Sequence, residues 1–375
     1  MSQAIEIKPV NTSKEMMTFI KFPWKVYQND PHWVPPLLMD RKKFLNREKN
    51  PFFQRNPSEF YLAYRNGKVV GRVAAIINHE HNKFHKDKMG FFGFLEAVND
   101  REVFAALLDT AKAWLKEKGY DKMMGPMNPS TNDEAGLLID GFDSPPYFMM
   151  THNPPYYAEH LDALGYQKAK DLYAYYIDEN MVHLGKKLER VSRGIREKFP
   201  VNIRPVNMKN FREELNLVRE IYNDAWAPNW GFVPMTPDEF DYVANDFKQI
   251  IDPEVVLIGE FKGEAVGFLL GMPDYNRVFK KIPNGRLLPF GIFTFLTNRK
   301  KIDSMRVITL GIKREYQPYG LGALFYMEIV QRGLAKGYKS AEMSWVLEDN
   351  EQMNKAAQLL GGKVHKTYRI YETDL

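Results

Sequence analysis

The chain has 375 residues, of which 44% are hydrophobic and 14% aromatic, and this composition excludes global disorder and suggests two domains. It contains no cysteine, which excludes disulfides, thiolate metal sites and a cysteine nucleophile. The net charge of +5 suits an anionic ligand, but the charges are interspersed, so nucleic acid is not expected as a partner. No secretory signal is visible, and a cytoplasmic location is expected.

The first distinctive segment, from Phe22 to Pro36, is rich in proline and tryptophan and includes Asp30. Such a segment can cover a ligand, but a structural arm is the favoured interpretation.

The chain contains an internal repeat. A hairpin is predicted at 59–75, because Asn66-Gly67 between apolar runs is a strong turn signal. The same pattern returns at 254–270, with Gly71 matched by Gly267, 196 residues later. Each copy then has a predicted helix that ends at Gly-Tyr, at 105–119 and 323–337, and a similar closing segment. The repeat predicts two tandem domains, over 1–180 and 181–375.

Three histidines, at 79, 81 and 85, have a spacing that is compatible with a metal. Lysines and other polar residues surround them, which favours a solvated loop, so no metal is expected.

Two loops are candidates for the acceptor of a reaction. The polar loop at 125–136 carries Asn128 and Asn132 with two acids, so an ammonium site is an alternative to an ordinary loop. The loop at 226–234, with Trp226 and Trp230, is suited to line an apolar channel, or equally to pack without a ligand.

The segment Leu287–Leu296 is apolar and has three basic residues on each side. It is too short to span a bilayer. A core segment with solvated ends is the favoured interpretation, and peripheral contact with an anionic inner membrane surface is the alternative.

The most informative stretch is Gln317–Gly322, which fits Q-x-x-G-x-G between a predicted strand at 306–312 and a helix at 323–334. Glycines let the backbone approach a ligand, and the free N–H groups of the first helical turn attract an anion. The arrangement predicts a diphosphate site.

With the strand predicted at 341–347 and Asn350 after it, this stretch resembles the signature of the GNAT superfamily of acyltransferases. The resemblance covers 201–375 well and 5–178 as a weaker copy. It implies an α/β (α+β) fold of two tandem GNAT-like domains, each a mixed, mostly antiparallel sheet flanked by helices. The double-domain arrangement also resembles bacterial ceramide synthase-like acyltransferases.

The resemblance implies acyl transfer from acetyl-coenzyme A, or another acyl-coenzyme A, to an amine. Backbone groups at Leu310 and Ile312 would polarise the thioester carbonyl. The other implied cofactor-binding residues are Gln317, Tyr319, Gly320, Leu321, Gly322, Ala323 and Asn350.

The residues that transfer protons are less well defined by the sequence than those that bind the cofactor. Glu348, at the end of the predicted strand, is the first candidate for the general base, with Glu342, Asp133 and Glu134 as competitors. Many members of the superfamily carry a tyrosine seven residues after the asparagine, which is Ala357 here. Three other tyrosines are candidates, by their positions in the chain, to act as this acid in its place: Tyr319, Tyr368 and Tyr371.

The first copy departs from the signature at 98–104, which has no glycine and two acids before the helix. Such a loop repels a diphosphate. The first domain is therefore expected to bind no coenzyme A, and either to wall the acceptor site or to stabilise the second domain. A small-molecule or lipid-like (sphingoid-type) amine is the expected acceptor, and a non-catalytic acyl-coenzyme A sensor is the alternative from another class.

Overall fold

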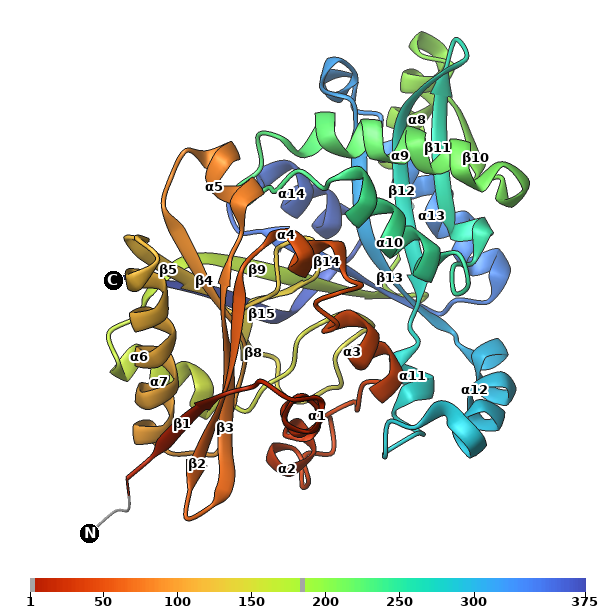
Figure 1. The fold of residues 1–375 in the computed structure, drawn as a ribbon. Coiled ribbons are helices and arrows are strands. Elements are labelled where there is room, and N and C mark those ends of the chain that lie inside the picture. The colour runs from red at the N-terminus through yellow and green to blue at the C-terminus, as the bar shows by residue number, and fades with distance from the viewer. Residues whose placement is uncertain (1–3, 183–185) are drawn as a thin grey trace. The chain divides into compact units, whose positions relative to one another are not determined.

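The computed structural model describes residues 4–182 and 186–375, and its ribbon is shown in Figure 1. The chain forms two compact units. The first comprises Met1–Leu172, Val278–Thr297 and Lys366–Leu375, and the second comprises Tyr173–Arg277 and Asn298–His365. The units are therefore not two contiguous halves, since a middle segment and the last strand of the chain belong to the first unit. The predicted domain boundary at 180 stays a prediction.

In the first unit, the main strands pair in the order β1-β2-β3-β4-β5-β15, and β8 pairs with β15. These pairs are antiparallel except β4 with β5, which is parallel. The strands are β1 Glu6–Pro9, β2 Ser58–Arg65, β3 Lys68–Ile77, β4 Met89–Ala97, β5 Lys122–Gly125, β6 Met127–Asn128, β7 Glu134–Ala135, β8 Leu137–Asp140, β9 Gln167–Asp178, which continues into the second unit, and β15 Lys363–Asp374, which begins there.

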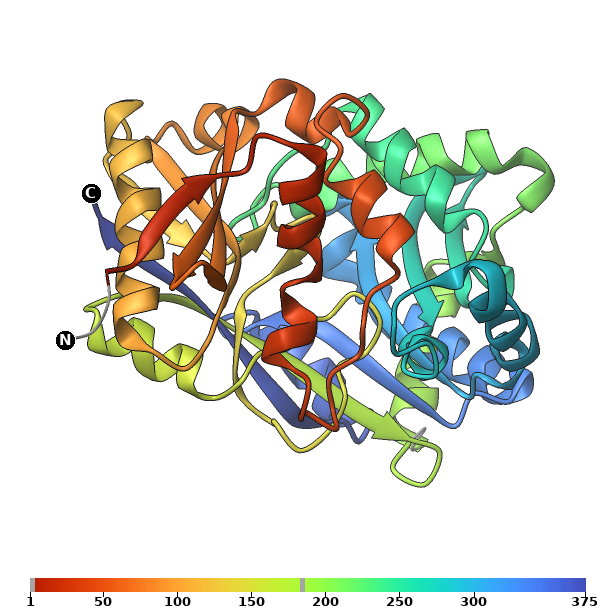
Figure 2. The ribbon, with the colours of Figure 1, turned by 60° about the horizontal axis from the view of Figure 1, so that its bottom comes forward.

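Helices cover both faces of the first unit's sheet. Tyr61 and the apolar face of α6 share one buried cluster, whereas the neighbouring residue Phe60 points to the other face and its ring packs against Phe19 of α1. Figures 1 and 2 show α6 and α1 on opposite sides of β2 and β3. The helices are α1 Ser13–Lys21, α2 Pro23–Val26, α3 Leu38–Phe44, α4 Pro51–Arg55, α5 His79–His85, α6 Arg101–Glu117, α7 Tyr156–Ala163, η3 Leu287–Gly291 and α12 Ile292–Asn298, with α11 Asn276–Phe279 at the junction of the units.

The second unit has the strand order β14-β13-β12-β11-β10, again with a single parallel pair, β13 with β14. Helix α13 packs on one face with a large apolar core, and α9 packs on the other. The strands are β10 Asn202–Pro205, β11 Val256–Phe261, β12 Glu264–Pro273, β13 Ser304–Ile312 and β14 Ser340–Leu347. The helices are α8 Lys186–Lys198, η1 Met208–Asn210, α9 Phe211–Trp226, α10 Pro237–Phe247, η2 Pro253–Val255, η4 Arg299–Lys301, η5 Arg314–Tyr319, α13 Gly322–Lys336 and α14 Glu351–Leu359.

The repeat predicted from the sequence is confirmed at the level of hairpin geometry. The β2–β3 turn has two residues with positive φ, Asn66 and Gly67, and the β11–β12 turn has Lys262 and Gly263. Both hairpins also have a register shift at matching positions, so that one residue of the second strand is left unpaired immediately before Gly71 or Gly267. Two copies of one supersecondary unit explain this correspondence.

Three local predictions are wrong. His79–His85 form helix α5 rather than a loop, and His81 is buried against Phe91, with burial as the main cause that lowers its pKa to about 4. Asp100 caps α6, so the first unit's helix begins at Arg101 and its preceding loop is shorter than predicted.

The third correction concerns Leu287–Leu296, which is not a core segment. Four large apolar side chains in it are exposed: Leu288 at 66%, Phe290 at 79%, Phe293 at 66% and Leu296 at 46%. No helix in residues 4–182 or 186–375 is long and apolar enough to cross a membrane.

Candidate functional site

The candidate cofactor site begins where β13 and β14 separate. Their parallel ladder ends at the pair Val307 and Met343. Strand β13 continues to Ile312 in register with β12 alone, after a bulge at Ile308. Within the described chain, backbone groups of this last stretch that point away from β12 are therefore not paired with β14. Leu310 lies in the middle of the stretch and is half-buried.

The glycine loop follows directly. Gly320 has a φ of 73°, a conformation that favours glycine, and α13 begins two residues later. Within the loop, the amide of Gly320 donates to Gln317 O at 3.2 Å and the amide of Ala323 donates to Gly320 O at 3.1 Å. The N–H groups of the N-cap residue Leu321 and of Gly322, the first residue of α13, make no such bond within the part of the chain that the structure describes, and they are the candidate anion donors.

The loop lies against the end of β13. A Cβ placed on Gly322 would be 3.6 Å from Leu310 Cδ2 and 3.7 Å from Ile312 Cδ1. The side-chain amide of Gln317 donates to Ile312 O at 3.0 Å. Anion donors and the open edge of β13 thus lie side by side, which is the arrangement that a diphosphate with a thioester arm requires. Tyr319 is 44% exposed, and its ring contacts that of Phe199.

Ion pairs hold the end of β13 to α9 and β12. Lys313 Nζ lies 2.8 Å from a Glu220 oxygen and 2.7 Å from a Glu264 oxygen. Burial opposes the charge of Lys313, but the hydrogen bonds to both carboxylates outweigh it and raise its pKa to about 12. Arg314 pairs with Asp224 in the same way. Sequence patterns do not reveal these contacts, because the partners are 49 to 93 residues apart.

Glu348 directly follows β14 and is half-buried. Asn354, which no sequence motif singles out, shapes this turn because its side-chain amide donates to the carbonyls of Leu347, Glu348 and Asn350. The side chain of Asn350 caps α14 by accepting from Met353 N at 3.1 Å. Asn350 and Asn354 together fix the backbone that carries Glu348.

Glu342, the nearest competitor for the general base, is fully buried. Its Oε1 accepts from Ser344 Oγ at 2.6 Å and its Oε2 lies 2.7 Å from His365 Nε2. Arg306 Nε in turn donates to Ser344 Oγ at 2.9 Å. Both Glu342 oxygens are thus engaged, so Glu348 is the more accessible carboxylate at the end of β14.

The candidate acid Tyr371 belongs to the first unit, where it lies in the apolar core. Burial is the main cause that raises its pKa to about 12. Ala357 is buried in the core of the second unit. The role of Tyr371 stays a prediction.

The candidate acceptor residues have diverse surroundings. Trp226 ends α9 and stacks on Tyr222, and Trp230 lies in the connection between α9 and α10, as expected. In the first unit, Asn128 Oδ1 accepts from Phe94 N at 2.6 Å, and Asn132 N donates to Ser130 Oγ. The acids of that loop are also engaged, since Asp133 accepts from Ser130 and Glu134 pairs with Arg41. Roles in acceptor binding stay predictions for all four candidates.

In the described residues of the first unit, side chains occupy the helix end and the strand edge that correspond to the candidate cofactor site. Asp100, at the N-terminus of α6, caps the helix through its carboxylate and pairs with Arg65. The ladder of β4 with β5 ends at Phe91 and Met124, and beyond it Asn128 occupies the edge of β4 through its bond to Phe94. A carboxylate at the helix and a side chain at the strand edge both oppose binding of a coenzyme A diphosphate.

Comparisons with known proteins agree with this description. No family model matches the chain. The chain is 37% identical over 380 residues to "Bacterial ceramide synthase" of Caulobacter vibrioides, covering 99% of this chain and 98% of that protein. It is 36% identical over 367 residues to "Protein YghO" of Escherichia coli, covering 96% and 93%.

Solved structures show the same fold at low identity. A tandem GNAT protein from the clavulanic acid biosynthesis pathway superposes with a TM-score of 0.57 at 12% identity, covering 99% of this chain and 98% of that one. A GCN5-related N-acetyltransferase from Sphaerobacter thermophilus has a TM-score of 0.54 at 10% identity, covering 99% and 95%. The predicted tandem GNAT fold, with mixed sheets flanked by helices, is confirmed.

Proposed function

Because the chain belongs to the family of the bacterial ceramide synthase of Caulobacter vibrioides, we propose that it transfers an acyl group from acyl-coenzyme A to the amine of a lipid-like acceptor. The observation that carries the acyl-coenzyme A part is that Gly322 in the glycine loop lies beside Leu310 on the open stretch of β13, where a Cβ on Gly322 would be 3.6 Å from Leu310 Cδ2. It combines an anion site with unpaired strand backbone, as a diphosphate and a thioester arm need.

In the proposed reaction, the acceptor ammonium first loses a proton, and its nitrogen then attacks the thioester carbonyl. A C–N bond forms, the C–S bond breaks, and the second amine proton ends on the coenzyme A thiolate. The loop amides of Leu321 and Gly322 hold the diphosphate, and backbone near Leu310 stabilises the oxyanion. Glu348 is the carboxylate that we assign to the first proton.

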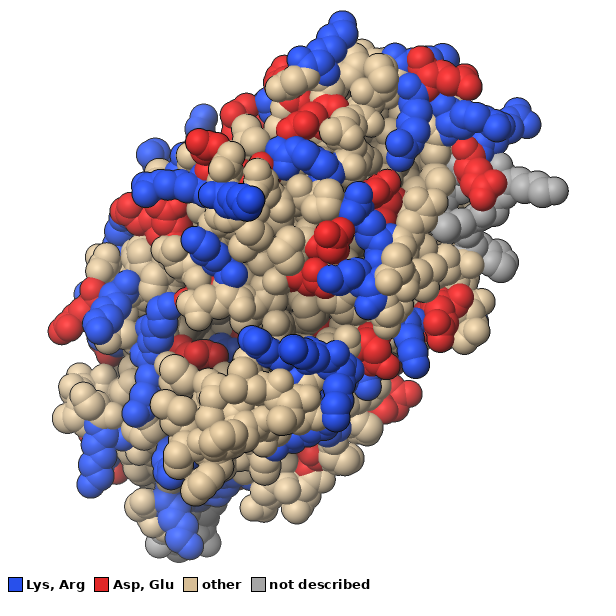
Figure 3. All heavy atoms as spheres, turned by 90° about the vertical axis from the view of Figure 1, so that its right-hand side faces the viewer, with Lys and Arg blue, Asp and Glu red and all other residues tan. Residues whose placement is uncertain are grey.

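A lipid-like acceptor is supported by the exposed surface around α12. Leu288, Phe290, Phe293 and Leu296 project from η3 and α12 into solvent, although an apolar surface of this kind is costly in water. Exposed basic residues precede and follow them in the chain: Lys280, Lys281, Arg286, Arg299, Lys300 and Lys301. Figure 3 shows a tan surface without charged residues on this side of the molecule, with blue side chains of Lys and Arg along its border.

Apolar side chains inside a basic border fit an anionic lipid surface, because the rings enter the acyl boundary while the cations meet the headgroups. We therefore propose peripheral contact with a membrane, where a long-chain amine and a long-chain acyl-coenzyme A would be found.

Release of free thiol is the test of the proposed reaction. The protein is mixed with acyl-coenzyme A of 2 to 16 carbons and with sphinganine, octylamine or a short polar amine, and the amide product is identified by mass. We expect turnover with a long-chain amine. Tight binding of acyl-coenzyme A with no turnover on any amine would instead support the sensor alternative.

A further inference from the structure

The first unit contains a buried histidine–carboxylate pair that the proposed transfer site does not use. His152 Nε2 lies 2.7 Å from Asp30 Oδ2, and the His152 side chain is 5% exposed. Asp30 comes from the arm between α2 and α3, and His152 comes from the segment between β8 and α7. The chain thus brings together two residues that are 122 positions apart.

The carboxylate determines which nitrogen of His152 carries the proton. Asp30 Oδ1 accepts the backbone amides of His32 and Trp33 at 2.8 and 3.2 Å. Burial opposes ionisation of Asp30, but the hydrogen bond from His152 and those from the arm outweigh it and lower its pKa to about 2. An ionised Asp30 accepts the proton of Nε2, so Nδ1 is the ring nitrogen that Asp30 leaves for another partner, and it carries a lone pair whenever it bears no proton.

The Nδ1 nitrogen of His152 has no protein partner. It is buried and makes no hydrogen bond with any residue that the structure describes. The same holds for Nδ1 of His32, two residues after Asp30. An unsatisfied buried polar atom costs about 1–3 kcal/mol, so two of them in one cluster point to a hydrogen-bonding guest.

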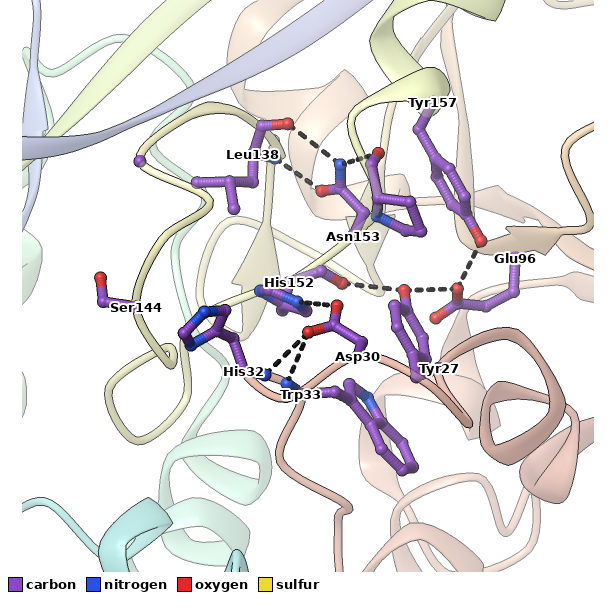
Figure 4. Close-up of polar contacts among 12 residues, drawn as sticks. Tyr27, Asp30, His32, Trp33, Glu96, Leu138, Ser144, His152, Asn153 and Tyr157 are labelled. Atoms are coloured by element: carbon purple, nitrogen blue, oxygen red, sulfur yellow. Dashed lines mark hydrogen bonds and ion pairs between the residues drawn. The ribbon is translucent and has the colours of Figure 1, made fainter.

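The backbone around His152 is held firmly. Tyr27 Oη donates to His152 O at 2.9 Å and also lies 2.7 Å from Glu96 Oε2 (Figure 4). The next residue, Asn153, uses its side chain to bind both the amide and the carbonyl of Leu138 on β8, at 2.7 and 3.0 Å. Such fixed geometry is typical of a binding position rather than of a side chain that fills space.

The surroundings define the chemistry of the guest. Tyr27 stacks on Trp33 and lies 5.9 Å from the His152 ring, and Trp24 packs edge-on against Trp33. Aromatic faces with an ionised carboxylate favour a cation, and the lone pair of Nδ1 requires an N–H or O–H donor. An ammonium or amino-alcohol group meets all of these requirements.

Apolar contacts lead from this cluster towards α12. Phe148, four residues before His152, lies 6.0 Å from the ring of Phe279, and Phe279 stacks on Phe295 of α12. Trp24 Nε1 also donates to Pro283 O at 2.7 Å, which ties the arm to the same segment. The polar cluster and the exposed apolar helix are thus joined by aromatic side chains of one unit.

We propose that the first unit binds the polar head of the acceptor, an amino-alcohol or ammonium group, through His152 Nδ1 with Asp30 as the positioning residue. This inference rests on the proposed function, in which a long-chain amine is acylated. Since Nδ1 is buried, the arm residues beside it must move when the head group enters.

Two measurements test the proposal separately from the transfer reaction. The protein, with ¹⁵N-labelled histidine, is titrated with 2-amino-1-octanol in the absence of acyl-coenzyme A. We expect the Nδ1 resonance of His152, assigned through loss in His152→Gln, to shift with saturation. No shift up to the solubility limit of the probe would overturn the proposal, whether or not the protein proves to be an acyltransferase.

The second measurement uses turnover. We expect His152→Gln to raise the KM for the acceptor by about 10- to 100-fold, the value of one hydrogen bond to a charged group, without change in acyl-coenzyme A affinity. Asp30→Asn should raise the same KM. The matched control is His160→Gln, because His160 is also bonded through Nε2, to Asn99, but lies on α7, half-buried against Phe104 and away from Asp30. Equal acceptor KM values in His152→Gln and His160→Gln would overturn the proposal.

Misfolding is excluded by thermal unfolding and by acyl-coenzyme A binding of each variant. If His152→Gln does not fold, Asp30→Asn and the titration of the unaltered protein decide the question. If no amine is acylated by the unaltered protein, the proposed function fails, and the titration still decides whether the head-group site exists.

Discussion

Gly71 and Gly267 each let a helix approach the sheet at the same position of the repeat. A Cβ on Gly71 would lie 2.6 Å from Leu107 Cδ1 of α6, and a Cβ on Gly267 would lie 2.9 Å from Phe325 Cε2 of α13. Neither glycine has a positive φ, so their common cause is space for the helix. Both units therefore need a residue without a side chain where the helix lies closest to the sheet, although only the second unit has the glycine loop at 317–322.

We expect Gly71→Ala and Gly267→Ala each to lower the free energy of unfolding by about 1–3 kcal/mol, because added atoms in a packed core force neighbours to shift. Chemical denaturation measures the change. Gly194→Ala is the control, since a Cβ there meets no atom within 4 Å, and it should be neutral or slightly stabilising. Equal stability of all three variants would contradict the packing argument.

The two glycines at the ends of α13 allow a test of the cofactor loop. Gly320 and Gly337 have φ values of 73° and 89°, so a glutamate causes similar backbone strain at either position. Only Gly320→Glu places a carboxylate at the helix N-terminus where the diphosphate is proposed to bind. We expect it to abolish coenzyme A binding by calorimetry while Gly337→Glu binds normally. Loss in both variants, or in neither, would refute the site.

Local signals made much of the fold predictable. The Asn66-Gly67 turn, the glycine stops of α6 and α13, and the glycine loop before α13 all depend on residues close together in the chain. Backbone conformation at such positions follows from the residues themselves. The backbone role expected at Leu310, by contrast, followed from the resemblance to the GNAT signature and not from the residues themselves.

The remaining features depend on contacts between distant residues. A sequence pattern does not reveal that most of the last strand, β15, belongs to the first unit, or that His152 lies next to Asp30. It also does not distinguish a buried apolar segment from an exposed one, so Phe290 and Phe293 were assigned to a core that they do not enter. Each of these features depends on tertiary contacts, which neither the periodicity nor the composition of the sequence reveals.

Glu348→Gln tests the assigned base. The substitution keeps the shape of the side chain, and Asn354 continues to hold the backbone carbonyl of residue 348. We expect normal acyl-coenzyme A binding and a turnover lower by about 10²- to 10⁴-fold, with partial recovery at high pH, where more of the amine is already neutral. Near-normal turnover across the pH range would transfer the role to another carboxylate or to water.

Binding to vesicles tests the apolar surface. We expect Phe290→Ser with Phe293→Ser to reduce sedimentation with vesicles that contain 30% anionic lipid by roughly 10-fold or more, since each exposed ring contributes about 1.5–3 kcal/mol when buried. Leu359→Ser is the control, because Leu359 is 64% exposed but lies on α14, outside the apolar segment Leu287–Leu296. Unchanged sedimentation of the double variant would contradict membrane contact through α12.

The stability of the protein in acid should report the Asp30–His152 pair. The pKa of Asp30 is lowered from 3.8 to about 2 in the folded state, so folding favours its ionised form. The stability that this shift contributes is present above pH 4 and is lost as the pH falls through about 2. A shift of this size is worth roughly 2 kcal/mol, of which about half is lost by pH 3. Asp30→Asn removes the titrating group, so the difference in unfolding free energy between the two proteins should narrow by about 1 kcal/mol from pH 6 to pH 3. Urea denaturation at several pH values measures this difference, and a constant gap across the range would show that Asp30 is not held ionised by His152 and the arm.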